Sequence, residues 1–388
     1  MSQTRRSFVK LLGTLAALPG SELMASALFP ASTGRLAKQG DYLLSAFDDQ
    51  QGQHFVGVFD LIKSQWLIRA QVQERYHSGV FSRPTVGEGT DSATSLKFIF
   101  VSRRPGKKAV ICDLLSQKVM EIAAPSGQHF YGHAALDGKG NAWFTENDFQ
   151  NGKGLITCRS ENVSGAVSNV IDLNGIGPHE LKFLSDGRHV VVGLGGIETH
   201  PDFPRKKLNL ESMKSELLLV DTATSEVIHR LSPPNPQLSL RHLDVAQDNT
   251  VVVGAQFQGP KYEQFPLVYW YAPGQALTAF DAPLAVWQSM NQYIASVTIN
   301  PVKQEVVVSC PRANAVHLFS LKDHQWKSSY RLQDPGGVSV DSNGHYLVSC
   351  GTGNILCLSS NNDVLALEQQ YTVSDTRWDN HMDRVVFS

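Results

Sequence analysis

Residues 217–228 read Leu-Leu-Leu-Val-Asp-Thr-Ala-Thr-Ser-Glu-Val-Ile, which is an apolar run, a polar turn and a second apolar run. The run His189-Val-Val-Val-Gly193 comes before it, and the turn Ser185-Asp-Gly187 separates that run from an earlier short strand. β-Branched and aliphatic residues favour strands, while Asp, Ser and Gly favour turns. The stretch therefore predicts four consecutive antiparallel strands with no amphipathic helix between them.

This pattern recurs along the chain with a period of about 50 residues. The apolar runs that correspond to 189–193 lie at residues 42–46, 98–102, 142–146, 250–254, 305–309 and 346–350. Seven four-stranded antiparallel units are typical of an all-β fold, the seven-bladed β-propeller. A pair of packed sheets, as in a β-sandwich, is the alternative fold that the strand pattern leaves open.

The first unit lacks an innermost strand, because it begins at its second strand near Tyr42. The C-terminal segment Trp378-Asp-Asn-His-Met-Asp-Arg-Val-Val-Phe387 is a spare strand of the required kind. We expect this segment to complete the first blade and close the ring. The propeller would then occupy residues 41–388, after a linker at residues 28–40.

The N-terminus has the parts of a cleavable export signal. Arg5-Arg6-Ser-Phe-Val-Lys10 precedes an apolar run from Leu11 to Leu18, and Ala25-Ser-Ala27 follows. The paired arginines resemble the twin-arginine motif, and the apolar run is too short to span a bilayer. We therefore expect residues 1–27 to be a twin-arginine signal peptide, and the mature protein to be periplasmic with no membrane span.

The composition describes a globular protein. Of the 388 residues, 42% are hydrophobic and 18% are charged, which excludes a disordered chain. Lys and Arg number 34 against 36 Asp and Glu, so no overall basic field exists to hold nucleic acid.

Five cysteines, an odd number, argue against a complete disulfide framework in the oxidising periplasm. Buried thiols explain most of them. Cys350 and Cys357 flank one predicted hairpin, and a turn centred between Gly353 and Asn354 would place them directly opposite each other. A strained disulfide between them is the alternative.

Five histidines share one position in the repeat. Each lies just before or at the start of the strand predicted to be innermost in its blade: His77, His133, His179, His242 and His381. Innermost strands line the central channel of a propeller, and their starts converge at one mouth. Neutral imidazole is the commonest protein ligand for zinc, copper, iron and nickel. The pattern predicts a histidine-lined metal site, although one histidine alone at a strand start usually has a structural role.

The loops that leave the second strand of each blade should reach the same mouth, because adjacent strands are antiparallel. They and the strand starts supply further candidates for contact with the metal ligands or with a bound molecule: Arg104, Glu146, Glu180, His200, Arg241 and Gln256. The longest insertion, from Gly195 to Ser215, also belongs to this end, and long loops in compact domains are often functional.

Several longer segments carry a family resemblance. They include Gly175-Ile-Gly-Pro-His-Glu-Leu181, Gly195-Gly-Ile-Glu-Thr-His-Pro-Asp202 and Trp378-Asp-Asn-His381, together with residues 98–106, 145–148, 207–213 and 240–243. These segments resemble a proteobacterial family of twin-arginine-exported propellers that is known only as a domain of unknown function. The resemblance implies a YVTN-type or quinoprotein-like propeller. Members are often encoded beside imelysin-type iron-associated proteins and a di-haem oxidoreductase, which implies partners among periplasmic iron-handling or haem proteins.

Three functions follow from these patterns. The first is binding of iron or copper, as the ion or as a metal chelate, in metal uptake or redox handling. The second is a metal-dependent enzyme, either a lactonase-type hydrolase or an oxidoreductase. Propeller lactonases use oxygen ligands around calcium, however, whereas imidazole outnumbers carboxylate at this mouth. The third is a metal-free protein-interaction scaffold.

Overall fold

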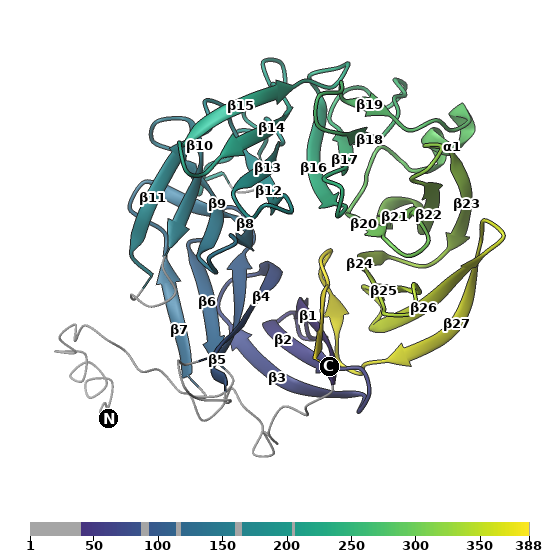
Figure 1. The fold of residues 1–388 in the computed structure, drawn as a ribbon, viewed down its shortest axis with the longest axis horizontal. Coiled ribbons are helices and arrows are strands. Elements are labelled where there is room, and N and C mark those ends of the chain that lie inside the picture. The colour runs from purple at the N-terminus through teal and green to yellow at the C-terminus, as the bar shows by residue number, and fades with distance from the viewer. Residues whose placement is uncertain (1–39, 87–92, 114–117, 160–164, 204–205, 388) are drawn as a thin grey trace, which may run out of the picture.

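A computed structural model of the chain describes residues 40–86, 93–113, 118–159, 165–203 and 206–387. Seven antiparallel sheets stand around a central axis, as Figure 1 shows along that axis. The chain is therefore a seven-bladed β-propeller, and the β-sandwich alternative is wrong. The expected signal peptide at residues 1–27 and all but Gly40 of the expected linker lie outside the described residues.

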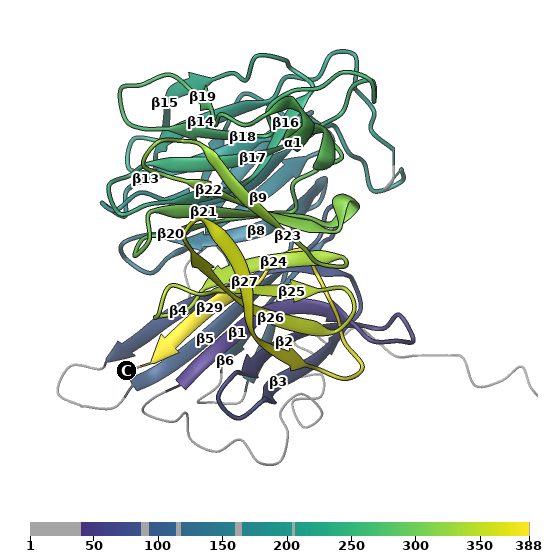
Figure 2. The same ribbon diagram turned by 90° about the vertical axis from the view of Figure 1, so that its right-hand side faces the viewer.

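Blade one combines the two ends of the described chain. Its sheet contains β1 (Gly40–Asp48), β2 (His54–Asp60), β3 (Gln65–Val72), β28 (Arg377–Trp378) and β29 (Asp383–Phe387). Both C-terminal strands pair with β1, with Phe47 opposite Trp378 and Leu44 opposite Asp383. Figure 2 shows β29 beside β1 at the C-terminal end of the chain. The prediction that the C-terminal segment closes the ring is confirmed.

The other six blades take their four strands in chain order from the axis outward. Blade two consists of β4 (Tyr76–Val86), β5 (Ala93–Ser102), β6 (Lys108–Asp113) and β7 (Lys118–Ala123). Blade three consists of β8 (Gln128–Leu136), β9 (Ala142–Asp148), β10 (Lys153–Arg159) and β11 (Val167–Asp172). Blade four consists of β12 (Pro178–Phe183), β13 (His189–Leu194), β14 (Glu216–Asp221) and β15 (Glu226–Leu231). Blade five consists of β16 (Leu238–Val245), β17 (Val251–Phe257), β18 (Val268–Tyr271) and β19 (Thr278–Ala279). Blade six consists of β20 (Ser296–Asn300), β21 (Glu305–Cys310), β22 (Ala315–Ser320) and β23 (Trp326–Arg331). Blade seven consists of β24 (Pro335–Val340), β25 (Tyr346–Cys350), β26 (Asn354–Asn361) and β27 (Val364–Thr372). Helix α1 (Leu284–Ser289) precedes blade six, and the 3₁₀ helix η2 (Pro311–Ala313) follows β21.

The hydrophobic core lies between neighbouring blades. In β13, Val190 and Val192 pack in a cluster shared with blade three, while Val191 packs in the cluster of blades four to six. Because both faces of a middle strand are covered, its sequence is a continuous apolar run rather than an alternating one. This double burial explains the runs of valine that identify the repeat.

The five cysteines are buried free thiols. In the hairpin of blade seven, Cys357 lies opposite Leu347, and Ser349 lies opposite Ile355. The turn therefore comprises residues 351–353 and is centred on Thr352, one and a half residues nearer the N-terminus than expected, so the expected placement of Cys350 directly opposite Cys357 is wrong. The two thiols also belong to different core clusters.

Among the residues that the structure describes, no helix is both long enough and apolar enough to cross a membrane.

Candidate metal centre

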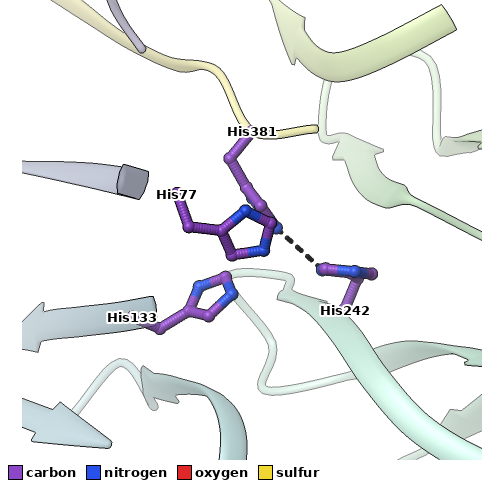
Figure 3. Close-up of side chains that lie close together, drawn as sticks. All are labelled: His77, His133, His242 and His381. Carbon is purple, nitrogen blue, oxygen red and sulfur yellow. Dashed lines mark hydrogen bonds between the residues drawn. The ribbon is translucent and has the colours of Figure 1, made fainter. Parts of the chain in front are cut away.

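Five histidine side chains from five different blades meet at the axis. The closest ring centroids are 4.5 Å apart for His77 and His381, 4.5 Å for His133 and His381, and 4.6 Å for His179 and His242. All five residues are buried, with at most 8% of their surface exposed. In four of them (His77, His133, His242 and His381), one ring nitrogen from each lies within 4.8 Å of the others. Figure 3 shows these four rings pointing toward one another from separate segments of the chain.

Irregular pairing of the innermost strands aims these rings at the axis. His77 in β4 and His179 in β12 are each an extra residue in a β-bulge, so neither has a partner on the second strand. A bulge re-aims side chains locally, which suits a site that must be reached from several strands. His381 occupies the break between β28 and β29. The expected placement at strand starts is wrong for His133 and His242, which lie inside β8 and β16.

Small residues make room for this crowding. Gly132 has a φ of +111°, and a Cβ at this position would lie 3.0 Å from Cδ2 of His77. Blade seven contributes no histidine but places Gly337 against the closing segment, where a Cβ would lie 2.3 Å from the backbone nitrogen of Met382. The glycine in blade seven thus lets the segment that carries His381 reach the axis.

Burial favours the neutral form of these rings, and two of their fully buried nitrogens have no hydrogen-bond partner among the described residues. Burial is the largest factor that lowers the pKa of each ring: His77, His133, His179, His242 and His381. One hydrogen bond of 2.8 Å joins Nε2 of His381 to Nδ1 of His242. Among the described residues, Nε2 of His133 and Nδ1 of His179 are buried without any hydrogen-bond partner. Such unpartnered buried nitrogens are rare, and a bound ion or water is a usual explanation.

Asp379 orients one of these rings. Its Oδ1 lies 2.7 Å from Nδ1 of His77, and Arg75 donates to its Oδ2 at 2.7 Å. Burial alone would raise the pKa of Asp379, but His77, Arg103 and Arg75 outweigh it and hold the pKa well below its ordinary value. The carboxylate therefore accepts a hydrogen bond from Nδ1–H and leaves the lone pair of Nε2 of His77 free to bind a metal. Many metal-bound histidines are held by a carboxylate in this way. The sequence analysis did not single out Asp379; its place two residues before His381 is the signal that could have found it.

Glu180 lies against the same rings, as its position beside His179 suggested. Its carboxylate accepts a hydrogen bond of 3.1 Å from the backbone nitrogen of Leu243 and lies 3.5 Å from Nδ1 of His242. Burial raises the pKa of Glu180 to about 8, although Lys182 opposes the shift. Lys182 itself pairs with Asp244 at 2.9 Å, so a partly exposed ion pair lies next to the histidines.

Arg241 and Arg104 lie on the other side of the histidines, at the mouth. Arg241 is buried beside His242, and burial together with the Arg104 charge lowers its pKa to about 9. Arg104 donates to the hydroxyl of Tyr131 at 2.5 Å, and the Tyr131 ring lies 6.1 Å from the His179 ring. Gln256 is buried at this end and donates to the carbonyl of Ile294.

Two predicted site residues lie elsewhere. Glu146 pairs with Arg159 and accepts a hydrogen bond from Thr157, so its carboxylate faces the packing between blades two and three rather than the channel. Strand alternation is the reason, because the preceding residue Thr145 faces the histidine strands and donates to the carbonyl of His133. His200 lies on the long loop and makes an edge-to-face contact with Phe149, so it does not belong to the set of four histidines.

A second set of donor atoms comprises Asp341, His345 and Cys357. Asp341 is already used by its turn, where it accepts from the backbone nitrogens of Asn343 and His345. Burial also raises the pKa of the Cys357 thiol to about 11, which disfavours the thiolate that metals require. The histidine cluster is the stronger candidate for a metal centre.

The fold and the site together define a β-propeller with a buried histidine cluster at one mouth of its channel. The chain belongs to the family described as "Protein of unknown function (DUF1513)", which it matches over residues 87–385. No curated protein matches the sequence.

Solved structures with the same fold share little sequence with this chain. Virginiamycin B lyase from Staphylococcus aureus is 12% identical, with a TM-score of 0.54 over 81% of this chain and 93% of that protein. A proposed 6-phosphogluconolactonase from Bacteroides fragilis is 14% identical, with a TM-score of 0.58 over 92% and 99%. Apo AztD from Citrobacter koseri is 14% identical, with a TM-score of 0.50 over 90% and 99%. At these identities the likeness concerns the fold alone.

Proposed function

We propose that this protein binds one transition-metal ion, iron or copper, through the histidine cluster on the propeller axis. The observation that carries the proposal is the convergence of four ring nitrogens within 4.8 Å of one another, from four different blades. Folding crowds these neutral rings together and leaves Nε2 of His133 buried without a partner. A bound metal ion would satisfy that nitrogen.

The donor set favours a borderline metal. Imidazole suits iron, copper, nickel and zinc, whereas calcium and magnesium prefer oxygen ligands. His77, His133, His242 and His381 would supply the ligands, and Asp379 would orient His77. The hydrogen bond between His242 and His381 would break on binding, because both nitrogens would then face the metal. His179 and Glu180 would line the site.

We also propose that the protein works in the periplasm, in metal uptake or redox handling. The paired arginines at residues 5 and 6 support export by the twin-arginine route, which carries folded proteins. Periplasmic iron-handling or haem proteins are the partners we propose, on the strength of the family resemblance. Replacing Arg5 and Arg6 by lysine should retain the protein in the cytoplasm, which fractionation would measure.

Metal analysis tests the binding proposal, with protein that is expressed as the full-length precursor and exported by the cell. The protein would be purified from periplasm, assayed for metals by mass spectrometry, stripped with a chelator and titrated with Cu²⁺, and with Fe²⁺ without oxygen. We expect one tightly held ion per chain. Bound Cu²⁺ should show nitrogen hyperfine splitting in its electron paramagnetic resonance spectrum.

Variants connect the binding to the cluster. His77→Ala with His133→Ala should weaken the metal affinity at least ~100-fold, because loss of one orienting neighbour alone costs 10–100-fold. The matched control is His229→Ala, an exposed histidine on the outer strand β15, which should leave the affinity unchanged. Stripped protein that binds neither ion, or a double variant that binds as the parent does, would refute the proposal.

A further inference from the structure

Four cations gather at the mouth, just outside the histidine cluster. They are Arg104, Lys207, Arg241 and Arg312. Burial, followed by the charges of Arg241, Arg312 and Arg104, lowers the pKa of Lys207, and burial followed by the Arg104 charge lowers the pKa of Arg241. Like charges repel, and the repulsion is strongest at the buried Arg241, where the surroundings have a low dielectric constant, whereas Lys207 and Arg312 are exposed. The folded chain holds these cations together nevertheless.

Arg241 is the most unusual member of this group. It is 6% exposed, and its one hydrogen bond to a described residue runs from Nε to the hydroxyl of Ser239 at 3.1 Å. No carboxylate of the described residues forms a salt bridge with it. A buried guanidinium without a counter-charge is strongly unfavourable, so such groups are nearly always paired. Both terminal nitrogens of Arg241 are thus available to an external anion, one residue from His242.

Aromatic side chains hold the neighbouring arginines where carboxylates would usually do so. Arg104 lies 5.0 Å from the Tyr131 ring centroid and donates to the hydroxyl of that residue. Arg312 lies 4.1 Å from the centroid of Tyr293. A tyrosine face positions a guanidinium while leaving its charge uncompensated. No salt bridge joins Arg104 or Arg312 to a residue within the described ranges.

Two other arginines at the same mouth show the contrast. Arg75 and Arg103 lie 2.7 Å and 3.6 Å from the carboxylate of Asp379, which also holds His77. The chain therefore neutralises the arginines on the blade-one side of the mouth, next to the histidine that Asp379 orients. It leaves Arg104 and Arg241 without an acid.

We propose that the mouth binds a small oxyanion with at least two negative charges, held by Arg241 and Arg104 directly outside the histidine cluster. Planar guanidinium groups match carboxylate and phosphate oxygens in pairs of charge-assisted hydrogen bonds. This inference deepens the proposed function, and the part of the inference that concerns metal rests on the proposed function. In that part, the metal ion would arrive as an anionic complex, with oxygen donors facing the arginines and imidazoles facing the metal. Anion binding by the metal-free protein is independent of that part.

Calorimetric titration of metal-free protein with citrate and with inorganic phosphate tests the anion site. Glycerol serves as the uncharged control, and chloride is kept low because salt screens exposed charges. We expect one anion per chain and a rise in melting temperature with that anion alone. Preference for citrate identifies a polycarboxylate site, and preference for phosphate identifies a phosphate site. Failure of both anions to bind at ~10 mM overturns the inference.

Variants assign the binding to the two arginines. Arg241→Gln should weaken anion affinity by about tenfold or more, which is the loss expected for one charge-assisted contact. Arg104 is half-buried, so Arg104→Gln should fold. This variant keeps the test decisive if Arg241→Gln does not fold. Arg230→Gln, which removes an outer-strand pair with Glu216, is the matched control and should bind as the parent does. Unchanged affinity in Arg104→Gln overturns the inference.

His133→Ala separates this inference from the proposed function. The variant should lose metal affinity and keep citrate or phosphate affinity, because the arginines are intact. If anions bind and metals do not bind even to the parent, the anion site stands and the proposed function falls. If metals bind and neither anion does, the proposed function stands and the anion site falls.

Discussion

Asp379 and His77 lie 302 positions apart in the chain, yet Oδ1 of the first is 2.7 Å from Nδ1 of the second. The contact exists only because the C-terminal segment returns to pair with β1. The same segment carries His381, whose backbone carbonyl accepts a hydrogen bond of 2.6 Å from Ser45. Closure of the ring and assembly of the histidine cluster are therefore one event.

Asp379→Asn should lower metal affinity by about 10–100-fold, because the neutral amide no longer fixes the Nδ1 proton of His77. The fold should survive, since Asn fits the space of Asp. Titration of the stripped protein with Cu²⁺ would measure the loss. Asp375→Asn, which breaks an exposed pair with Arg69, is the matched control and should change nothing. Equal affinity in Asp379→Asn and the parent would show that this carboxylate has no part in metal binding.

Gly337→Ala should displace the closing segment. The new methyl carbon would lie 2.3 Å from the backbone nitrogen of Met382, a distance that forces the backbone to move. We expect a loss of ~1–3 kcal/mol in the free energy of unfolding, the usual cost of overpacking, together with weaker metal binding through the shift of His381. Urea unfolding and metal titration would measure the two effects.

Gly138→Ala is the comparison for that change, because its Cβ would lie 3.3 Å from Cα of Gly187 in a turn far from the site. Its loss of stability should be smaller, and its metal affinity should equal that of the parent. A Gly337→Ala protein with parental metal affinity would contradict the coupling between closure and site.

The architecture could be predicted because burial on both faces leaves a strong trace in the sequence. Val190, Val191 and Val192 are all buried between blades, and seven such runs with turns between them identify the strands and their count. His133, His179 and His242 could be assigned to the axis for the same reason, since each precedes the next apolar run by a similar number of residues, whereas His77 lies much farther ahead of the run at residues 98–102. Repetition carried both predictions.

The details that depart from the repeat could not be predicted. His133 and His242 lie inside their strands, at or beside irregular pairing, and no residue type marks such an irregularity unambiguously. A turn centred one and a half residues nearer the N-terminus than expected separated Cys350 from Cys357. Glu146 was expected at the mouth, but neighbouring side chains on a strand point to opposite faces, so a small error in register sends a carboxylate into the packing between blades.

The five thiols should be unreactive in the folded protein and all titratable after unfolding. Each is buried, and burial raises the pKa of Cys112 and of Cys350 to about 12 in each case, so little thiolate exists at neutral pH. Ellman's reagent in about 6 M guanidinium, which unfolds most proteins, should report five thiols per chain in protein purified without reductant. Three thiols would reveal a disulfide and contradict the five free thiols of the structure.

His317→Leu should stabilise the protein, and more so in acid. Both ring nitrogens of His317 are buried without a partner, and burial lowers its pKa to about 4. Replacing such a polar group by an apolar one of similar size removes a desolvation penalty of ~1–3 kcal/mol. Below pH ~6.5 the unfolded chain also gains a proton that folded His317 refuses, so the parent loses stability as the pH falls toward 4 and the variant avoids that loss.

The gain from His317→Leu should therefore grow by ~1.4 kcal/mol between pH ~7.5 and pH ~5.5, the value of one pKa unit of differential proton uptake. Urea unfolding of the metal-free proteins at the two pH values measures it. His229→Leu on the exposed strand β15 is the control, and its effect should be the same at both. A gain for His317→Leu that does not depend on pH would contradict this account. It would mean that the ring of His317 takes up a proton in the folded protein, and the protonated ring would then need water or an anion between the blades as its partner.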